Sequence, residues 1–245
     1  MISEITFSKR FTSFWNETLP NANNYIRLIN GGQVQATHKP LKAAPRKQNV
    51  ALVNVLAFEI YRRLTAQKSS FSVVSSPSFF RGRLFASSMK SAREYVDRFG
   101  THQTYKLPLS AAEQSQLKDI VRLTNSRYNW QLSPTVDPRF DGCGFVDQCC
   151  GDIIIGQRLV EIKSGERTFG VSDLRQLLVY CTLNHYSRAP VQIDSIEIFN
   201  PRMGAYFSEK VETVSLRLSA LNSHELFAEI QKYISDGAFT EVVEG

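Results

Sequence analysis

Two short aliphatic runs separated by a Gly-Gln pair constrain the fold of this chain more than any other stretch. The sequence GDIIIGQRLVEIKSG, residues 151–165, is rich in β-branched residues and bounded by glycines, which is typical of two strands joined by a tight turn. Because side chains alternate along a strand, one face is wholly aliphatic and the other can bring Asp152, Glu161 and Lys163 together. Ionised groups are costly in such surroundings unless they are paired, hydrated or bound to a metal.

Two carboxylates on adjacent strands repel each other unless a cation lies between them. Mg²⁺ prefers carboxylate, carbonyl and water oxygens, so we expect Asp152, Glu161 and the main-chain carbonyl of Ile162 to bind Mg²⁺ or Mn²⁺. Such a metal makes its bound water easier to deprotonate and stabilises charge on a phosphate. Lys163, on the same face as Glu161, is then predicted to orient the water or to stabilise the transition state.

The pattern D-x8-E-x-K formed by Asp152, Glu161 and Lys163 resembles that of the PD-(D/E)XK nuclease superfamily. The segment SDLRQLLVYCTLN, residues 172–184, resembles the helix that follows the core hairpin in that superfamily. The segment IEIFNPRMG, residues 196–204, resembles the strand and turn of its recombination-associated and defence-associated branches.

This resemblance implies an α/β fold with a restriction-endonuclease-like core, in which a mixed central β-sheet is flanked by helices and preceded by a helical N-terminal lobe. We expect a basic helical region over 1–135 and the nuclease core over 136–245. The implied activity is metal-dependent hydrolysis of DNA phosphodiester bonds, in DNA repair or anti-phage defence. Gln176 is expected to assist catalysis, with Tyr180 one turn along the same helix face and able to contact the nucleic acid. Gly151 replaces the proline of the superfamily motif.

The choice of the remaining acid stays open in the sequence. Many members of the superfamily carry a glutamate on the first core helix that helps to hold the metal, and both Glu59 and Glu94 are candidates for it. Asp147 competes with Asp152 as the first acid, because its interval to Glu161 is also acceptable. We prefer Asp152, since its strand leads directly into the next one through the tight turn.

The distribution of charge favours a polyanionic partner, and DNA is the expected one. The chain has 29 Lys and Arg against 23 Asp and Glu, a formal net charge of +6, which is compatible with such a partner. The excess lies mainly in the N-terminal half. We expect the DNA backbone to be contacted by Lys42, Arg46, Lys47 and Arg81.

The remaining elements follow from periodicity, capping residues and glycine or proline breaks. The expected helices are 4–30 with a break at Pro20, 49–65, 82–100, 110–128 with a capping box at Ser110 and Glu113, 172–185, and a last one capped by Ser223. The expected strands are 143–149, 152–156, 158–163, 191–200 and 205–216, with 72–82 as strand or loop.

Other functional classes are disfavoured. No apolar run reaches the length of a membrane span and the N-terminus lacks the apolar stretch of a signal peptide, so we expect a cytoplasmic protein without membrane contact.

The four cysteines are expected to be free thiols, although Cys143, Cys149 and Cys150 could form a thiol-ligated metal module. Two further alternatives are a non-catalytic DNA-binding scaffold and a nuclease subunit active only with a separate ATPase or helicase. A homodimer is expected only by analogy with enzymes that cut both strands.

Overall fold

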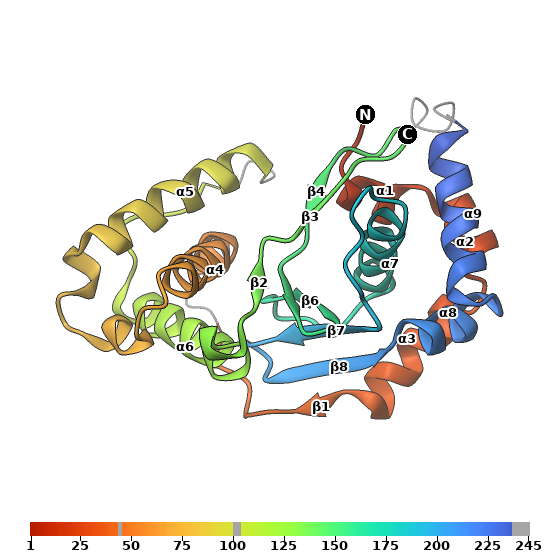
Figure 1. Cartoon of the computed structure of the whole chain (residues 1–245). Coiled ribbons are helices and arrows are strands. Elements are labelled where there is room, and N and C mark those ends of the chain that lie inside the picture. The colour runs from red at the N-terminus through yellow and green to blue at the C-terminus, as the bar shows by residue number, and fades with distance from the viewer. Residues whose placement is uncertain (44–45, 100–103, 237–245) are drawn as a thin grey trace.

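The protein is a mixed α/β structure built around one six-stranded sheet (Figure 1). The computed structural model describes residues 1–43, 46–99 and 104–236. The strand order is β1-β8-β7-β6-β5-β2, and the sheet is mixed because β6 and β7 are parallel while the other neighbours are antiparallel. The strands are β1 (Gln35–Ala36), β2 (Thr135–Val136), β5 (Ile153–Ile155), β6 (Arg158–Ile162), β7 (Ser195–Asn200) and β8 (Ala205–Lys210); a separate ribbon pairs β3 (Arg139–Phe140) with β4 (Cys149–Cys150).

The predicted hairpin at the centre of the chain is confirmed. Strands β5 and β6 are antiparallel, with Ile155 opposite Arg158 and Ile153 opposite Val160. The turn between them begins at Gly156, whose φ of +57° lies in the left-handed region that glycine adopts at no steric cost. If the pairing is continued by one residue beyond Ile153 and Val160, Asp152 lies opposite Glu161.

The chain leaves β6, forms helix α7 (Val171–His185) and returns as β7, parallel to β6. This helix is buried on nearly all sides, as expected for a helix that is apolar around most of its circumference. Leu174 and Leu177 of α7 belong to the same hydrophobic cluster as Leu159 of β6 and Ile196 of β7. Helix α7 therefore covers the sheet face that also carries Glu161.

The N-terminal segment packs on this same α/β core. It forms α1 (Glu4–Arg10), α2 (Thr12–Thr18), α3 (Ala22–Leu28) and a π-helical turn (Ile29–Gln33), and then pairs as β1 with β8. Its large side chains share one cluster with α7, α8 (Val211–Ser219) and α9 (Ser223–Ser235). The N-terminal segment thus packs with helices that lie beyond residue 136 in the sequence.

A helical unit with its own core lies on the other side of the sheet (Figure 1, left). It consists of α4 (Val50–Ala66), α5 (Arg83–Phe99) and α6 (Ala111–Arg127). Helix α6 begins with the predicted capping box, in which the Ser110 hydroxyl accepts from the Glu113 N–H and the Glu113 carboxylate accepts from the Ser110 N–H. Tyr61 of α4 packs against Val160 and Phe199 on the second face of the sheet, so the aliphatic face of the hairpin is buried as expected.

Several predicted elements are wrong. The strand expected over 205–216 ends at Lys210 and continues as α8, because its buried residues Val211, Val214, Ser215 and Leu218 follow a helical period. The strand expected over 143–149 is reduced to Cys149–Cys150.

Smaller differences concern helix ends and short helices. The segment 72–82 contains two 3₁₀ helices, Phe71–Ser75 and Phe79–Arg81. The cap of the last helix is Asn222 rather than Ser223. The stop expected at Gly100 lies outside the described residues. None of the helices in the described part of the chain is long and apolar enough to span a membrane.

A buried charge cluster fastens α6 to the sheet. Glu197 of β7 is fully buried, and its carboxylate accepts from Arg127 Nε at 2.6 Å, from Arg158 Nη1 at 2.8 Å and from the Tyr128 hydroxyl. The Arg127 guanidinium also lies 3.7 Å from the centre of the Tyr206 ring, within the range of a cation–π interaction. Each member of the cluster therefore has partners that compensate for its burial.

Replacing Glu197 by alanine is expected to lower the free energy of unfolding by about 2–4 kcal/mol, because the buried Tyr128 hydroxyl and the partly buried Arg127 and Arg158 lose their shared carboxylate. Urea-induced unfolding of Glu197→Ala and wild type would measure this loss. The control is Glu94→Ala, whose side chain is 66% exposed and 4.0 Å from Lys90; we expect it to change stability by less than about 0.5 kcal/mol. Equal effects of the two substitutions would contradict the assigned role of the cluster.

Candidate active site

The charged end of the β5–β6 hairpin forms the floor of a cleft. The cleft has a volume of about 460 Å³. Asp152, Glu161 and Lys163 lie at its floor. Its walls come from α4 and α5 on one side and from α1 and α7 on the other. Residues of α1, α4, α5 and α7 therefore meet at the charged end of the β5–β6 hairpin.

The position of Asp152 is set by the backbone on both sides of it. Its Oδ2 accepts from the N–H of Ile162 at 2.6 Å, which holds the carboxylate against the neighbouring strand. The N–H of Gly151 donates to the carbonyl of Pro138 at 3.0 Å. A Cβ at position 151 would lie 3.1 Å from the Phe140 ring. A proline here would lose that hydrogen bond, so glycine suits this position.

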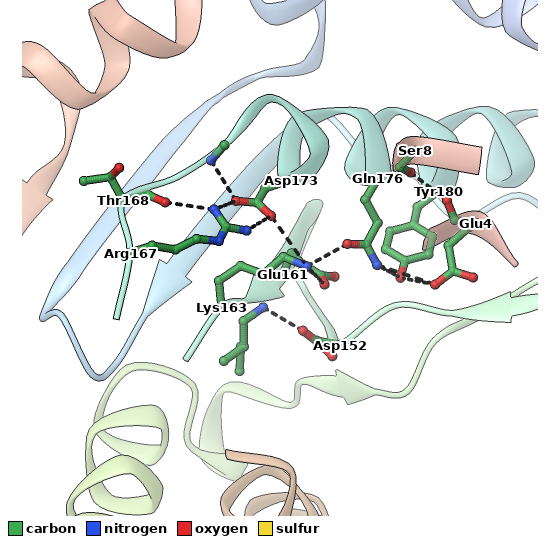
Figure 2. A network of polar contacts seen from close by, with 12 residues as sticks. Glu4, Ser8, Asp152, Glu161, Lys163, Arg167, Thr168, Asp173, Gln176 and Tyr180 are labelled. Atoms are coloured by element: carbon green, nitrogen blue, oxygen red, sulfur yellow. Dashed lines mark hydrogen bonds and ion pairs between the residues drawn. The ribbon is translucent and has the colours of Figure 1, made fainter. Parts of the chain in front are cut away.

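Lys163 joins the hairpin to the first turns of α7 (Figure 2). Its Nζ donates to Glu161 Oε1 at 2.8 Å and to Gln176 Oε1 at 2.7 Å, and it lies 3.9 Å from Asp173 Oδ1. Asp173 in turn accepts two hydrogen bonds from Arg167 and one from the N–H of Gly170. The lysine is thus held between a strand and a helix that the β6-α7-β7 crossover brings together.

The structure adds an acid that the sequence analysis missed. Glu4 of α1 is 8% exposed and lines the cleft. Its Oε1 accepts from the Tyr180 hydroxyl at 3.2 Å and from Gln176 Nε2 at 3.5 Å (Figure 2). One signal could have found it, because Glu4 shares a helical spacing with Phe7 and Phe11 and so lies on the apolar face of the N-terminal segment.

Burial and mutual repulsion shift the ionisation of this cluster. Burial raises the pKa of Asp152 well above its usual value, and the carboxylate of Glu161 raises it further. Burial also raises the pKa of Glu161, although Lys163 opposes the shift. Burial alone would lower the pKa of Lys163, but the carboxylates of Glu161 and Asp173 outweigh this effect and the pKa is raised. Clustered shifts of this kind in a cleft are typical of functional sites.

The three other acids considered in the sequence lie in different surroundings. Glu59 lines the cleft, where its carboxylate accepts from Arg62 at 2.6 Å and lies 3.5 Å from Arg63. Glu94 is exposed on α5, and Asp147 is not among the residues that line the cleft. Of the acids left open by the sequence, Glu59 alone therefore reaches the cleft, and Glu4 is the acid linked to Gln176.

Two of the expected DNA-binding residues are engaged inside the protein. Arg46 forms an ion pair with the buried Glu113, and its Nη2 also donates to the carbonyl of Pro108 at 3.0 Å. Tyr180 is only 2% exposed, and its ring stacks on Phe140, so it is not available to stack on a base. The other three expected residues, Lys42, Lys47 and Arg81, are exposed.

The donor set suits a hard divalent cation. In the described part of the chain no group of three or more His, Cys, Asp or Glu side chains is placed to hold a metal, and this includes the alternative module of Cys143, Cys149 and Cys150. Mg²⁺, however, is usually bound through only one or two carboxylates, together with waters and substrate phosphate oxygens. The opposed pair Asp152 and Glu161 provides two such carboxylates.

Scans against protein-family models, curated proteins and solved structures found no match to this chain.

Hydrogen bonds hold the segment that follows Lys163 against the helical unit. Asn54 of α4 donates from Nδ2 to the carbonyl of Ser164 at 2.8 Å and accepts at Oδ1 from Arg202 at 2.8 Å. Arg202 is 1% exposed and also donates to Ser164 O at 3.0 Å and to Gln116 Oε1 at 3.1 Å. The position of Lys163 thus depends on hydrogen bonds from outside the hairpin.

Removing the side chain of Asn54 is expected to loosen this segment specifically. The control is Asn49 at the start of α4, which makes two comparable hydrogen bonds, both to the backbone of Lys106. We expect Asn54→Ala and Asn49→Ala each to cost about 1–3 kcal/mol of stability. Hydrogen exchange in peptides covering 161–168 should accelerate in Asn54→Ala alone. Equal exchange in the two variants would contradict this role of Asn54.

Because the pKa of Asp152 is raised, replacing its carboxylate by a neutral side chain is expected to stabilise the fold, and the gain should depend on pH. Because the folded protein binds this proton more tightly than the unfolded chain does, ionisation of Asp152 destabilises the fold as the pH rises above the unfolded-state pKa. Asp152→Asn should therefore melt at a higher temperature than wild type at pH 8 in EDTA. The difference should shrink as the pH falls to about 4, where an unperturbed aspartate is half protonated. A difference in melting temperature that is constant from pH 4 to 8 would argue against this assignment.

Proposed function

We propose that this protein is a Mg²⁺-dependent or Mn²⁺-dependent deoxyribonuclease that hydrolyses DNA phosphodiester bonds. The observation that carries the proposal is the end of the β5–β6 hairpin. There the register sets Asp152 opposite Glu161, and Lys163 lies beside them on the floor of a cleft. This combination of two acids and a lysine suits metal-assisted hydrolysis of a phosphate ester better than it suits a structural ion pair.

The topology supports assignment of the central region to a restriction-endonuclease-like core of the PD-(D/E)XK type. Strands β2, β5 and β6 are antiparallel neighbours, and α7 then connects β6 to the parallel strand β7. The residues of the D-x8-E-x-K pattern lie at the end of the hairpin, and Gln176 on the following helix contacts the lysine directly. This arrangement of strands, acids and helix supports the proposed assignment.

Each residue of the site has a separate role in the proposed reaction. Asp152, Glu161 and the carbonyl of Ile162 would hold the metal, which when bound lowers the pKa of water and neutralises phosphate charge. Lys163 would orient the attacking water or stabilise the transition state. Gln176 accepts a hydrogen bond from the Lys163 ammonium group and so helps to fix its position. Glu4 acts through Gln176 and Tyr180, whose side chains it orients. The exposed Lys42, Lys47 and Arg81 would contact the phosphate backbone outside the cleft.

Replacing Glu161 by alanine is expected to abolish cleavage while DNA binding is retained, because the lost carboxylate holds the metal rather than the DNA. The assay uses single-stranded, linear and supercoiled DNA with Mg²⁺, with Mn²⁺ and with EDTA. We expect wild type to cleave only with metal, and Glu161→Ala to be slower by roughly a factor of 100 or more.

The control for this assay is Asp147→Asn, since Asp147 competes with Asp152 in the sequence but does not line the cleft. We expect it to cleave like wild type. Full activity of Glu161→Ala would refute the proposed site. If neither wild type nor variant cleaved although Mg²⁺ bound normally, a nuclease subunit that requires a partner ATPase or helicase would replace the proposal. Absence of Mg²⁺ binding would favour the non-catalytic scaffold.

A further inference from the structure

The walls of the cleft differ in chemistry from a surface that binds the outside of a duplex. Among the described residues that line the cleft, Lys163 is the one base, against five acids. Above the floor the walls carry apolar and aromatic side chains, namely Ile5 of α1, Val55 and Phe58 of α4 and Tyr95 of α5. The surfaces nearest to the site therefore offer little attraction to a phosphate backbone.

A base-paired duplex presents its anionic backbone outward and hides the faces of its bases in the stack. A protein that approaches it uses basic and hydrogen-bonding side chains on the phosphates. An unpaired strand is different, because each exposed base has a π-face that can stack on an aromatic side chain whatever its sequence. Apolar and aromatic walls around a site for phosphate chemistry therefore suit an unpaired strand better than a duplex.

Tyr95 is well placed for such stacking. The residue is 48% exposed and lines the cleft. The adjacent residues Ala92 and Val96 are buried in the core of the helical unit, which fixes the helix that carries the tyrosine. Phe58 lines the same cleft from α4, with its ring 6.0 Å from that of Tyr61. Two aromatic side chains on packed helices therefore lie on one side of the cleft.

We propose that the site takes an unpaired DNA strand, such as single-stranded DNA, a flap or a frayed end. In this arrangement a base packs against Tyr95 and Phe58 while the adjacent phosphate reaches the floor at Asp152 and Glu161. The inference rests on the proposed nuclease function, for which it names the substrate class. Duplex DNA would be cut only where its strands separate.

The first test measures binding separately from cleavage. The Glu161→Gln variant is titrated with a fluorescent single-stranded oligonucleotide and with a blunt, fully paired duplex of the same sequence. We expect tighter binding of the single strand. Tyr95→Ala in this background should weaken that binding by about 5- to 150-fold, the effect of losing one stacked base. Tyr95→Phe should restore it, because the ring rather than the hydroxyl makes the contact.

The matched control is Tyr186→Ala, which removes a tyrosine that is 45% exposed at the end of α7 and does not line the cleft. We expect it to bind the single strand like its parent. In cleavage assays on wild-type background, Tyr95→Ala should raise KM for the single strand with a smaller change in kcat.

The outcomes separate the inference from the function on which it rests. Tighter binding of the duplex, or single-strand binding unaffected by Tyr95→Ala, would overturn the inference even if metal-dependent cleavage were lost in Glu161→Ala. Absence of metal-dependent cleavage would overturn the proposed function, while the binding titration would still decide between an unpaired strand and a duplex.

Discussion

The opposition of two carboxylates across one hairpin is the constraint on which the rest of the site depends. Asp152 and Glu161 occupy paired positions on adjacent strands, in a region where burial alone disfavours their charged forms. Natural sheets avoid like charges directly opposite each other because the pair is destabilising. The chain compensates with a backbone N–H on Asp152 and with one ammonium group from Lys163, which also donates to Gln176 of α7. A stability penalty of this kind is typical of a site that serves chemistry.

The surrounding structure makes this compensation possible. The crossover from β6 to β7 lays α7 over the charged end of the hairpin, and burial of α7 on nearly all sides prevents it from shifting. On the opposite face of the sheet, Asn54 and Arg202 hold the end of β6 against the helical unit. Lys163 therefore lies between α7 and the helical unit, which pack on opposite faces of the sheet. The position of its ammonium group depends on the packing of both.

The sequence alone predicts the local part of this arrangement. Alternating aliphatic residues and a glycine turn predict the hairpin, and the opposition of Asp152 and Glu161 follows from its register. The serine and glutamate at the start of α6 predict its capping box in the same way. The strand-to-helix change at Lys210 was missed, since the β-branched residues Val211, Thr213 and Val214 directly follow a strand and a helical period over nine residues is easily taken for a strand.

Non-local contacts could not be read from the sequence. The link of Glu4 to Tyr180 spans 176 residues, and that of Asn54 to Ser164 spans 110. The ion pair of Arg46 with Glu113, which occupies an arginine expected to bind DNA, spans 67 residues. Such pairs depend on how complete elements pack, and a single sequence carries no periodic signal for them.

The contribution of α1 to the cleft has a consequence for the order of assembly. Helix α1, which precedes α7 and α9 in the sequence, supplies Glu4, yet the partners of Glu4 lie on α7, and its neighbour Phe7 packs in one cluster with Ile230 of α9. Closing loops of this length is entropically unfavourable, and contacts between distant parts of a chain form slowly. The cleft is therefore completed only when nearly the whole chain is available. A chain interrupted before α9 would contain the hairpin and its acids but would lack part of the packing that holds the N-terminal wall in place.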